Sequence, residues 1–486
     1  MKKLCLTLVL LLALMQIAAM LAACSGGGDA AAVTATAADT TSAGTEAPKE
    51  FLLPDEDFDG KEAVFYLRMT PDDWSADDVV SEGQDGSSIN DAVYLRNVAI
   101  EDKYNLKITG YKPDSLNHSV YNPVSNSILA GESTYDVVTS SHYDAAKFMI
   151  GGMLLDLKTL EYIDLDREWW NPVLNKTISM ANRQYYATGD ISRVDNLGVR
   201  CFFFNKDLAA NLGIDSPYEA ANDGSWTFAK LFELATAGTA DINGDGVLDK
   251  EDRFGITAQS SLGIVLAYSG GVSVTGKDAE DMPCIVINTE RSIEVMNSVI
   301  EYLSGNKDIH YSDNWINTQN RFTAGQTLFQ AEVLLLIEAL RGSEVNIGII
   351  PAPKYNEAQE NYIHYLDAHC LNLYSVPVTV SAPDFSAFVL EAMAQKSVTT
   401  LTPAFYDICL NGKYVRDEES SEMLDIIFAS YIMDNAGGFG WGGMYSGVSG
   451  ALKNGSEIVS VIESNLSKTQ EAIDKSVGQF REVISG

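Results

Sequence analysis

The stretch Tyr135-Asp136-Val137-Val138-Thr139-Ser140-Ser141 has the composition of a buried strand that ends in small polar residues. Upstream, residues 63–67 form an apolar run that is typical of another buried strand, and residues 107–111 form a further one. Residues 88–104 between them carry apolar side chains at helical spacing. This β-α-β-α beginning predicts an α/β fold with mainly parallel sheets flanked by helices, and a ligand crevice at the carboxyl ends of the strands.

The N-terminus has the layout of a secretory signal, because Lys2 and Lys3 precede an apolar run at 4–20. That run is short for a membrane span. The residues that follow, Leu21-Ala22-Ala23-Cys24, resemble the bacterial lipobox, in which the signal is removed and the cysteine is lipidated. We therefore expect a signal at 1–23 and a lipid anchor on Cys24 at the extracellular face of the cell membrane. A plain cleaved signal or an N-terminal helical anchor is the alternative.

Residues 24–50 are rich in Ser, Gly, Ala and Thr and contain almost no large apolar side chain. Such a segment cannot bury enough surface to offset the conformational entropy of the chain, so we expect a flexible linker. A flexible chain of this length spans about 25–30 Å between its ends. It would hold a globular receptor off the membrane surface.

Composition limits the remaining classes. The chain has 486 residues, of which 46% are hydrophobic, and this length suggests two lobes or domains. The 67 acidic residues against 33 basic ones argue against nucleic acid as a partner. Four cysteines follow Cys24 without any Cys-x-x-Cys pair, which makes a zinc site improbable. They either pair as disulfides or remain single buried thiols: Cys201, Cys284, Cys370 and Cys409.

Several short motifs then follow one another in order. Tyr135-Asp136-Val137-Val138 is followed by Gly151-Gly152-Met153-Leu154-Leu155-Asp156-Leu157. The others are Trp169-Trp170-Asn171, residues 185–190, Phe204-Asn205-Lys206-Asp207-Leu208 with Leu212-Gly213-Ile214 and Pro217, Trp226-Thr227-Phe228 with 232–235, and 322–326 with Pro351-Ala352-Pro353. In this order they resemble the extracellular solute-binding proteins of ABC importers, of the sugar-binding type that includes maltose-binding protein. The resemblance covers most of residues 63–428. Leu334-Leu335-Leu336 departs from it, because the family often has a small residue and a Trp there.

The resemblance implies a two-lobe, periplasmic-binding-protein-like fold with a cleft between the lobes. Lobe one would comprise 51–188 and return at 371–429, lobe two would comprise 189–370, and helices at 430–486 would lie on lobe two and the hinge. The implied function is the capture of a solute, most often an oligosaccharide, and its delivery to the membrane subunits of an ABC importer. A lipid-anchored carbohydrate-active enzyme and a ligand-sensing receptor for a signalling partner are the alternatives.

Candidate ligand-binding residues follow from position at strand ends and crossovers. Arg68 ends the first strand, Ser140, Ser141, Tyr143 and Asp144 follow the strand at 135, and Gln259 follows a strand at 255–258. Asp144 is also where the family places a hydroxyl-binding carboxylate at a helix start. The other candidates are Trp170, Asp190 in the expected crossover, and Trp441 in a Gly-rich turn. Each of these residues has a plain structural role as its alternative.

Residues 241–252 hold oxygen-bearing side chains at the spacing of a calcium loop. Asp241, Asn243, Asp245, Asp249 and Asp252 occupy positions 1, 3, 5, 9 and 12, Val247 offers its carbonyl at position 7, and Gly246 permits the turn. The loop resembles an EF-hand loop of the dockerin kind, although Asp252 stands where regulatory EF-hands have Glu. We expect structural Ca²⁺ between a helix and a strand; an acidic turn without metal is the alternative.

Sequence motifs give an enzyme little support. The chain has no Gly-x-Ser-x-Gly elbow, His-Glu-x-x-His helix, P-loop or Gly-x-Gly-x-x-Gly after a strand. A glycosidase needs two carboxylates on either side of the scissile bond, and nothing marks such a pair. We therefore expect a binding protein without catalytic residues.

Overall fold

The computed structural model describes residues 52–70, 74–113, 119–340, 343–410 and 418–485, with the backbone only for 407–410. The expected signal, Cys24 and the linker lie outside the described residues. Residues 50–486 form one compact unit. Within the described part, no helix combines the length and the apolar character that a membrane crossing requires.

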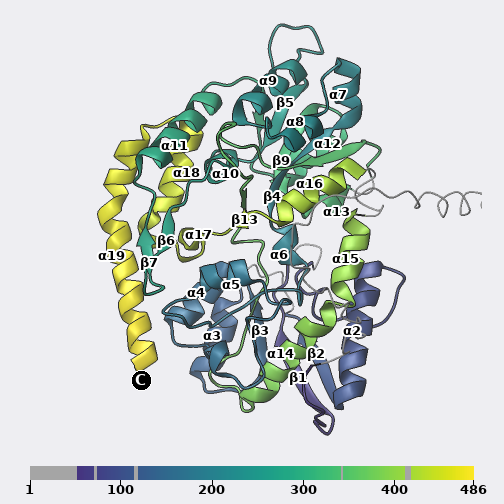
Figure 1. Cartoon of the computed structure of the whole chain (residues 1–486), viewed down its shortest axis with the longest axis vertical. Helices are drawn as coiled ribbons and strands as arrows, with labels where there is room; N and C mark the ends of the chain where they lie inside the picture. The colour runs from purple at the N-terminus through teal and green to yellow at the C-terminus, as the bar shows by residue number, and fades with distance from the viewer. Residues whose placement is uncertain (1–51, 71–73, 114–118, 341–342, 411–417, 486) are drawn as a thin grey trace, which may run out of the picture. The chain divides into compact units, whose positions relative to one another are not determined.

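The first lobe is built on a four-stranded sheet with the order β12-β3-β1-β2 (Figure 1). β1 (Lys61–Tyr66) pairs in parallel with β2 (Leu106–Tyr111) and β3 (Val137–Ser140). Between β1 and β2, α2 (Ser88–Tyr104) covers the range predicted to be helical. All four residues of β3 are buried, as expected for the stretch at 135–141. The predicted β-α-β-α beginning is therefore present.

The second lobe is built on a five-stranded sheet with the order β10-β4-β9-β5-β8. β5 (Phe254–Ala258) runs parallel to β8 (Ile309–Tyr311) and β9 (Thr327–Val333). β4 (Arg200–Asn205) is antiparallel to β9 and to β10 (Ile347–Ile350). β4 ends where the Asn205 side chain accepts a hydrogen bond from the Leu208 amide at 2.9 Å and caps the next helix.

Two of the segments that carry the chain between the lobes are 187–199 and 366–372. They lie side by side, because the Asp367 amide donates to the Gly198 carbonyl at 3.1 Å. The first leads into β4 and the second into β12 (Leu373–Ser375), which is antiparallel to β3. Strands that enter a sheet directly from the other lobe need no crossover helix and run antiparallel to a neighbour. Both sheets are therefore mixed, and less uniformly parallel than the sequence pattern indicates.

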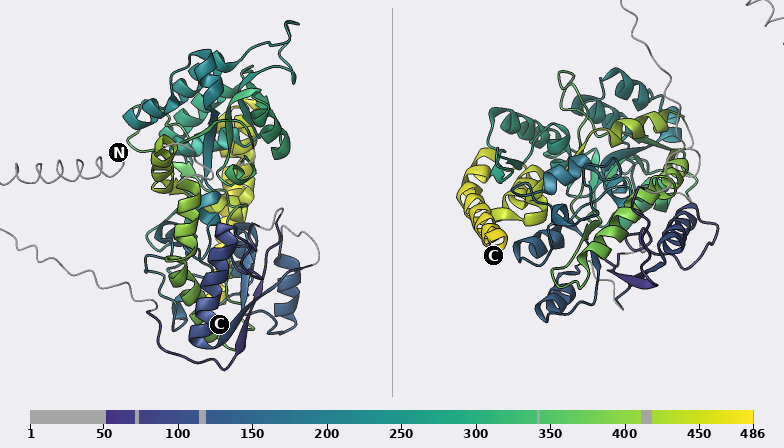
Figure 2. Two further views of the ribbon diagram at one scale, coloured as in Figure 1. Left: turned by 90° about the vertical axis from the view of Figure 1, so that its right-hand side faces the viewer. Right: turned by 60° about the horizontal axis from the view of Figure 1, so that its bottom comes forward.

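Helices pack around both sheets (Figures 1 and 2). Those of the first lobe, besides α2, are α3 (Tyr121–Leu129), α4 (His142–Ile150), η2 (Leu157–Thr159), α5 (Pro172–Ile178), α14 (Pro383–Ser397) and α15 (Leu401–Leu410). Those that follow β4 up to β10 are α7 (Lys206–Leu212), α8 (Pro217–Asp223), α9 (Phe228–Gly238), α10 (Leu262–Ser269), α11 (Glu290–Leu303), α12 (Trp315–Thr323) and α13 (Leu336–Leu340). The remaining helices are α6 (Val194–Leu197), α16 (Glu418–Phe428), α17 (Asn435–Phe439), η3 (Trp441–Gly443), α18 (Met444–Asn454) and α19 (Ile458–Ser485).

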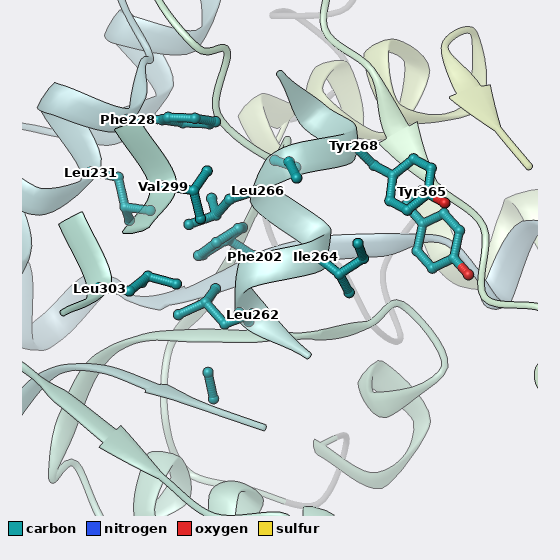
Figure 3. Packing of buried hydrophobic residues seen from close by; sticks show 14 of the residues in the cluster. Phe202, Phe228, Leu231, Leu262, Ile264, Leu266, Tyr268, Val299, Leu303 and Tyr365 are labelled. Atoms are coloured by element: carbon teal, nitrogen blue, oxygen red, sulfur yellow. The ribbon is translucent and has the colours of Figure 1, made fainter. Parts of the chain in front are cut away.

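The core of the second lobe is centred on α10, whose eight residues are all buried. A helix that is apolar all round belongs in an interior. Figure 3 shows Phe202 of β4, Leu231 of α9 and Val299 of α11 around it. On the far side Tyr268 stacks on Tyr365 at a centroid distance of 4.5 Å. This packed body fixes the strand ends that carry the pocket described below.

The lobes also touch through a hairpin that follows α10, made of β6 (Thr275–Lys277) and β7 (Pro283–Ile285). The Lys277 ammonium donates to the carbonyls of Lys176 and Ser179 at the end of α5, both at 2.6 Å. It also donates to the Asp281 carboxylate at 2.7 Å. Carbonyls at a helix end lack partners inside the helix, and Lys277 supplies one. We call this contact between 275–285 and 176–182 the hairpin latch.

The last helix, α19, runs along elements of both lobes (Figures 1 and 2). Near its start it contacts α11 and α18, and further along it contacts α4. Phe480 meets the Tyr185 ring edge-on at 5.6 Å. The apolar stripe predicted along this helix is core packing, because Ile458, Ile462 and Ile473 are buried. The remaining paired strands are β11 (His364–Tyr365) and β13 (Tyr431–Ile432), which run parallel.

Candidate ligand-binding pocket

A pocket with a volume of about 640 Å³ lies where the second lobe meets the crossing segments. Parallel strands β5, β8 and β9 place their carboxyl ends there, as expected for ligand sites of α/β folds. Trp74 comes from the connection after β1 in the first lobe. The lining residues are Trp74, Arg200, Gln259, Asp313, Trp315, Glu332, Val333, Leu335, Leu336, Glu338, Ala339, Asp367, His369 and Cys370.

The polar wall of the pocket is organised by Arg200, which is 8% exposed. Its guanidinium donates to Glu332 at 2.7 Å and to Asp367 at 2.5 Å. The Gln259 amide donates to the other oxygen of Glu332 at 2.8 Å. Burial acts to raise the pKa of Asp367, but the Arg200 charge and its hydrogen bond bring that pKa below its ordinary value. Both carboxylates are thus held in fixed positions, and Asp367 is held there as an ionised acceptor.

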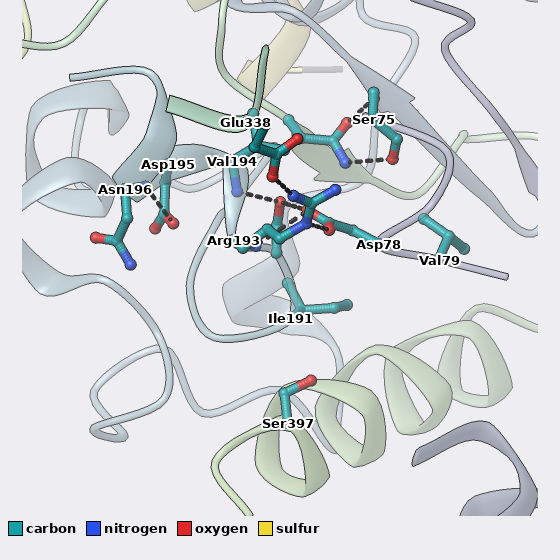
Figure 4. A network of polar contacts seen from close by, with 12 residues as sticks. Ser75, Asp78, Val79, Ile191, Arg193, Val194, Asp195, Asn196, Glu338 and Ser397 are labelled. Carbon is teal, nitrogen blue, oxygen red and sulfur yellow. Dashed lines mark hydrogen bonds and ion pairs between the residues drawn. The ribbon is translucent and has the colours of Figure 1, made fainter. Parts of the chain in front are cut away.

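A second arginine stands behind the wall, in the crossing segment (Figure 4). Arg193 donates through Nε to Asp78 at 2.8 Å and also pairs with Glu338, which lines the pocket. Asp78 is fully buried and accepts the Ser192 hydroxyl at 2.6 Å. Asp78 belongs to the first lobe and Glu338 to α13 of the second. Arg193 therefore ties both lobes to the crossing segment beside the pocket.

Two indoles give the pocket flat apolar surfaces. Trp315 begins α12 and is 39% exposed, whereas Trp74 is 9% exposed. The Arg68 guanidinium lies 5.5 Å from the centroid of the Trp74 ring and donates to the Leu371 carbonyl at 3.1 Å. Leu335 and Leu336 complete this side, at the place where the sequence departs from the family pattern. Flat rings beside fixed hydrogen-bonding groups are what sugar rings require.

Of the nine residues predicted to bind ligand, the structure brings Gln259 to this pocket. Arg68 lies behind Trp74, and the Tyr143 ring lies 6.4 Å from His369, a lining residue. Asp144 accepts the Val120 amide at 2.7 Å, so it holds the chain before α3. Ser140 and Ser141 are buried between β3 and α4.

The two tryptophans predicted at the site have internal partners. Trp170 is fully buried, and its indole donates to Glu391 at 2.7 Å. Trp441 donates to the Ser476 hydroxyl of α19 at 2.9 Å. Sequence reasoning missed Trp74 and Trp315. The only signal for Trp315 is its position just after a strand, behind the Asn314 cap.

Asp190 lines a smaller pocket of about 240 Å³ at the crossing segment, together with Asp195 and Tyr431. Burial raises the pKa of Asp190 to about 6. Burial, and then the charge of Asp190, raise the pKa of Asp195 well above its usual range. Asn171 donates to the Asp195 carboxylate at 3.3 Å. Two carboxyls with raised pKa values thus line the same pocket at the crossing segment.

The loop at 241–252 lies between α9 and β5, so it has one flanking helix and one flanking strand, as predicted. Asp241 accepts the amides of Gly244 at 2.6 Å and Gly246 at 2.8 Å, and Asp252 accepts the amide of Ile242 at 2.9 Å. Across the residues that the structure describes, no group of three or more His, Cys, Asp and Glu side chains is arranged to hold a metal ion.

The cysteines predicted either to pair or to stay single are free thiols at Cys201, Cys284 and Cys370, while the Cys409 side chain lies outside the described part.

No family model matches the chain, and no curated protein matches its sequence. Solved structures do match. UspC of M. tuberculosis is 14% identical over 85% of this chain and 100% of its own, with a TM-score of 0.56. A cyclo/maltodextrin-binding protein complexed with maltotetraose is 13% identical over 87% of this chain and 97% of its own, with a TM-score of 0.54. RafE from Streptococcus pneumoniae is 14% identical over 89% of this chain and 100% of its own, with a TM-score of 0.51. The chain therefore has the two-lobe α/β fold of the solute-binding proteins it was predicted to resemble.

Proposed function

We propose that this protein captures an oligosaccharide in the 640 Å³ pocket and delivers it to the membrane subunits of an ABC importer. The observation that carries the proposal is the pairing of two indoles with a preorganised row of hydrogen-bonding groups. Trp74 and Trp315 offer faces for sugar rings, and Gln259 and Glu332 are fixed by their own hydrogen bond. The cyclo/maltodextrin-binding protein with a similar fold holds maltotetraose, which supports the choice of an oligosaccharide.

Binding without turnover is also favoured by the chemistry of the wall. A glycosidase needs a carboxylic acid that stays protonated near neutral pH, and that requires a raised pKa. Asp367 has a lowered pKa instead, because Arg200 outweighs the effect of burial. Two carboxylates with raised pKa values, Asp190 and Asp195, lie in the other pocket.

Titration calorimetry against a panel of neutral and basic oligosaccharides tests the proposal. Trp315→Ala should weaken binding of any ligand found by about 1–2 kcal/mol, since it removes one ring face. Ile316→Ala is the matched control: Ile316 is the next residue and 47% exposed, but it does not line the pocket. The assignment would be refuted if no sugar gave a heat of binding, or if both variants lost the same amount of binding affinity.

We propose further that Cys24 carries a lipid anchor that keeps the protein at the extracellular face of the cell membrane. The support is the sequence Leu21-Ala22-Ala23-Cys24 after a signal-like run. Cells expressing wild type or Cys24→Ala should differ on fractionation, with the variant leaving the membrane fraction. Equal retention of both would show that the anchor is elsewhere.

Structural Ca²⁺ in the loop at 241–252 is a third proposal. Its support is the ligand spacing and a backbone that already turns at Gly244 (φ 78°) and Gly246 (φ 83°). Ca²⁺ would have to draw the carboxylates together, and at a hundredfold excess over Kd it would stabilise the fold by about 3 kcal/mol.

The calcium test compares melting temperatures with Ca²⁺ and with chelator. Wild type and Glu251→Ala should both melt higher with Ca²⁺, because Glu251 occupies position 11, which is no ligand position. Asp245→Ala should lose the difference. A wild type that melts at one temperature under both conditions would mean that the loop is an acidic turn without metal.

A further inference from the structure

The charges that line the large pocket are unequal. Four carboxylates, those of Asp313, Glu332, Glu338 and Asp367, accompany a single guanidinium, that of Arg200, and one imidazole, that of His369. Cys370 adds no charge, because burial raises the pKa of its thiol to about 12. The lining is therefore rich in negative charge before any ligand enters.

Each arginine at the wall is shared between two carboxylates. Arg200 pairs with Glu332 and Asp367, and Arg193 behind the wall pairs with Asp78 and Glu338. Two guanidiniums thus serve four carboxylates, which leaves the wall with excess negative charge. These pairs are largely buried, where solvent screens charge poorly.

The rim and the floor of the pocket do not reverse this excess. Asp313 at the rim meets Lys453 at 3.5 Å, but both side chains are exposed and water weakens their pairing. Arg68 lies behind the Trp74 ring, and its charge is shared between Asp144 and Asp367, so it adds one guanidinium and brings one further carboxylate. Trp315 presents a half-exposed ring, and the face of an indole attracts cations. The carboxylates and the ring face therefore both favour a positively charged group in the ligand.

We propose that the pocket selects oligosaccharides that carry a protonated amine and discriminates against those that carry a carboxylate. This deepens the proposed function and rests on it. An ammonium group makes charge-assisted hydrogen bonds to fixed carboxylates, which are roughly twice as strong as neutral ones. A ligand carboxylate at the same place meets like charge and loses its hydration.

The test uses three trisaccharides in calorimetry: the trimer of glucosamine, its fully N-acetylated form, and the trimer of galacturonic acid. The amine-bearing trimer should bind roughly tenfold more tightly than the acetylated one, and the uronate should not bind. The affinity advantage of the amine-bearing trimer over the acetylated one should shrink at high salt, because part of it comes from exposed charge. Asp313→Asn should reduce the advantage severalfold. Glu463→Gln, an exposed carboxylate on α19, should leave it unchanged.

Asp313→Asn keeps an oxygen to accept the Ser260 amide, so the variant retains its local fold. Equal or tighter binding of the acetylated trimer, or measurable binding of the uronate, would overturn the charge selection. Binding of a neutral oligosaccharide from the wider panel with none for the glucosamine trimer would also overturn it, while leaving the proposed function intact. If the protein bound none of the sugars, the proposed function and this inference would both be refuted.

Discussion

Burial shifts the pKa values of single side chains in this protein, and Asp190 is one such case. Burial raises its pKa to about 6, and Asp195 beside it is raised further. Between the usual carboxyl pKa and 6, the folded protein therefore binds more protons than the unfolded chain. The free energy of unfolding then falls as pH rises through this window, since ionising the carboxyl in its buried place is costly.

We expect Asp190→Asn to raise the free energy of unfolding at pH 7 by about 1–2 kcal/mol, because it removes a buried charge that also repels Asp195. The gain should shrink as pH falls towards 4, where Asp190 is protonated in the folded state and about half protonated in the unfolded chain. Urea unfolding at several pH values measures it, with the exposed Asp166→Asn as control. A gain that does not vary between pH 4 and 7 would contradict this account.

At the residue scale the sequence identifies positions better than roles. Gln259, which was predicted from its position at a strand end, lines the pocket. Asp144 does begin a helix region, yet its carboxylate holds the Val120 amide. Trp74 and Trp315 lie in connections whose paths depend on packing between distant segments, so no local pattern marks them as lining residues.

At the scale of elements, the hairpin latch is a polar contact with little exposure. Lys277 and Asp281 have side chains that are 18% and 15% exposed, and Asp281 also accepts the Asn182 amide at 2.8 Å. Three residues here, Ala181, Asn182 and Asp281, have positive φ values without being glycine. Such conformations cost energy and persist because the surrounding contacts enforce them.

Lys277→Met should therefore leave the Asp281 carboxylate and two helix-end carbonyls without their ammonium partner. We expect a loss of about 1–3 kcal/mol and faster amide hydrogen exchange at 176–182 and 275–285. Lys230→Met is the control, because Lys230 pairs with Glu233 on an exposed helix face. Unchanged exchange at 176–182 would show that the hairpin does not hold α5.

Strands and helices with strong periodicity could be predicted from the sequence. Whether neighbouring strands run parallel or antiparallel could be predicted only in part. The first three strands and α2 follow from local patterns. The antiparallel pairing of β4 and β12 with their neighbours does not follow from local patterns, because it depends on where the chain crosses between the lobes. The hairpin latch also escaped prediction, since residues about a hundred positions apart form it.

The molecule as a whole combines two lobes, the segments that cross between them and a pocket at their junction. Binding proteins of this architecture work when a ligand has higher affinity for the closed arrangement than for the open one. Arg193 links the lobes beside the pocket, and the hairpin latch and α19 link them elsewhere. A ligand that touches both Trp74 and Trp315 would bridge the lobes directly.

Small-angle scattering during a titration with the tightest-binding oligosaccharide tests this central claim most directly. We predict that the radius of gyration decreases as the sugar saturates the pocket, that Trp315→Ala needs more sugar for the same decrease, and that the sugar is recovered intact. Saturation by the sugar with unchanged scattering, or its recovery as a cleaved product, would contradict the account.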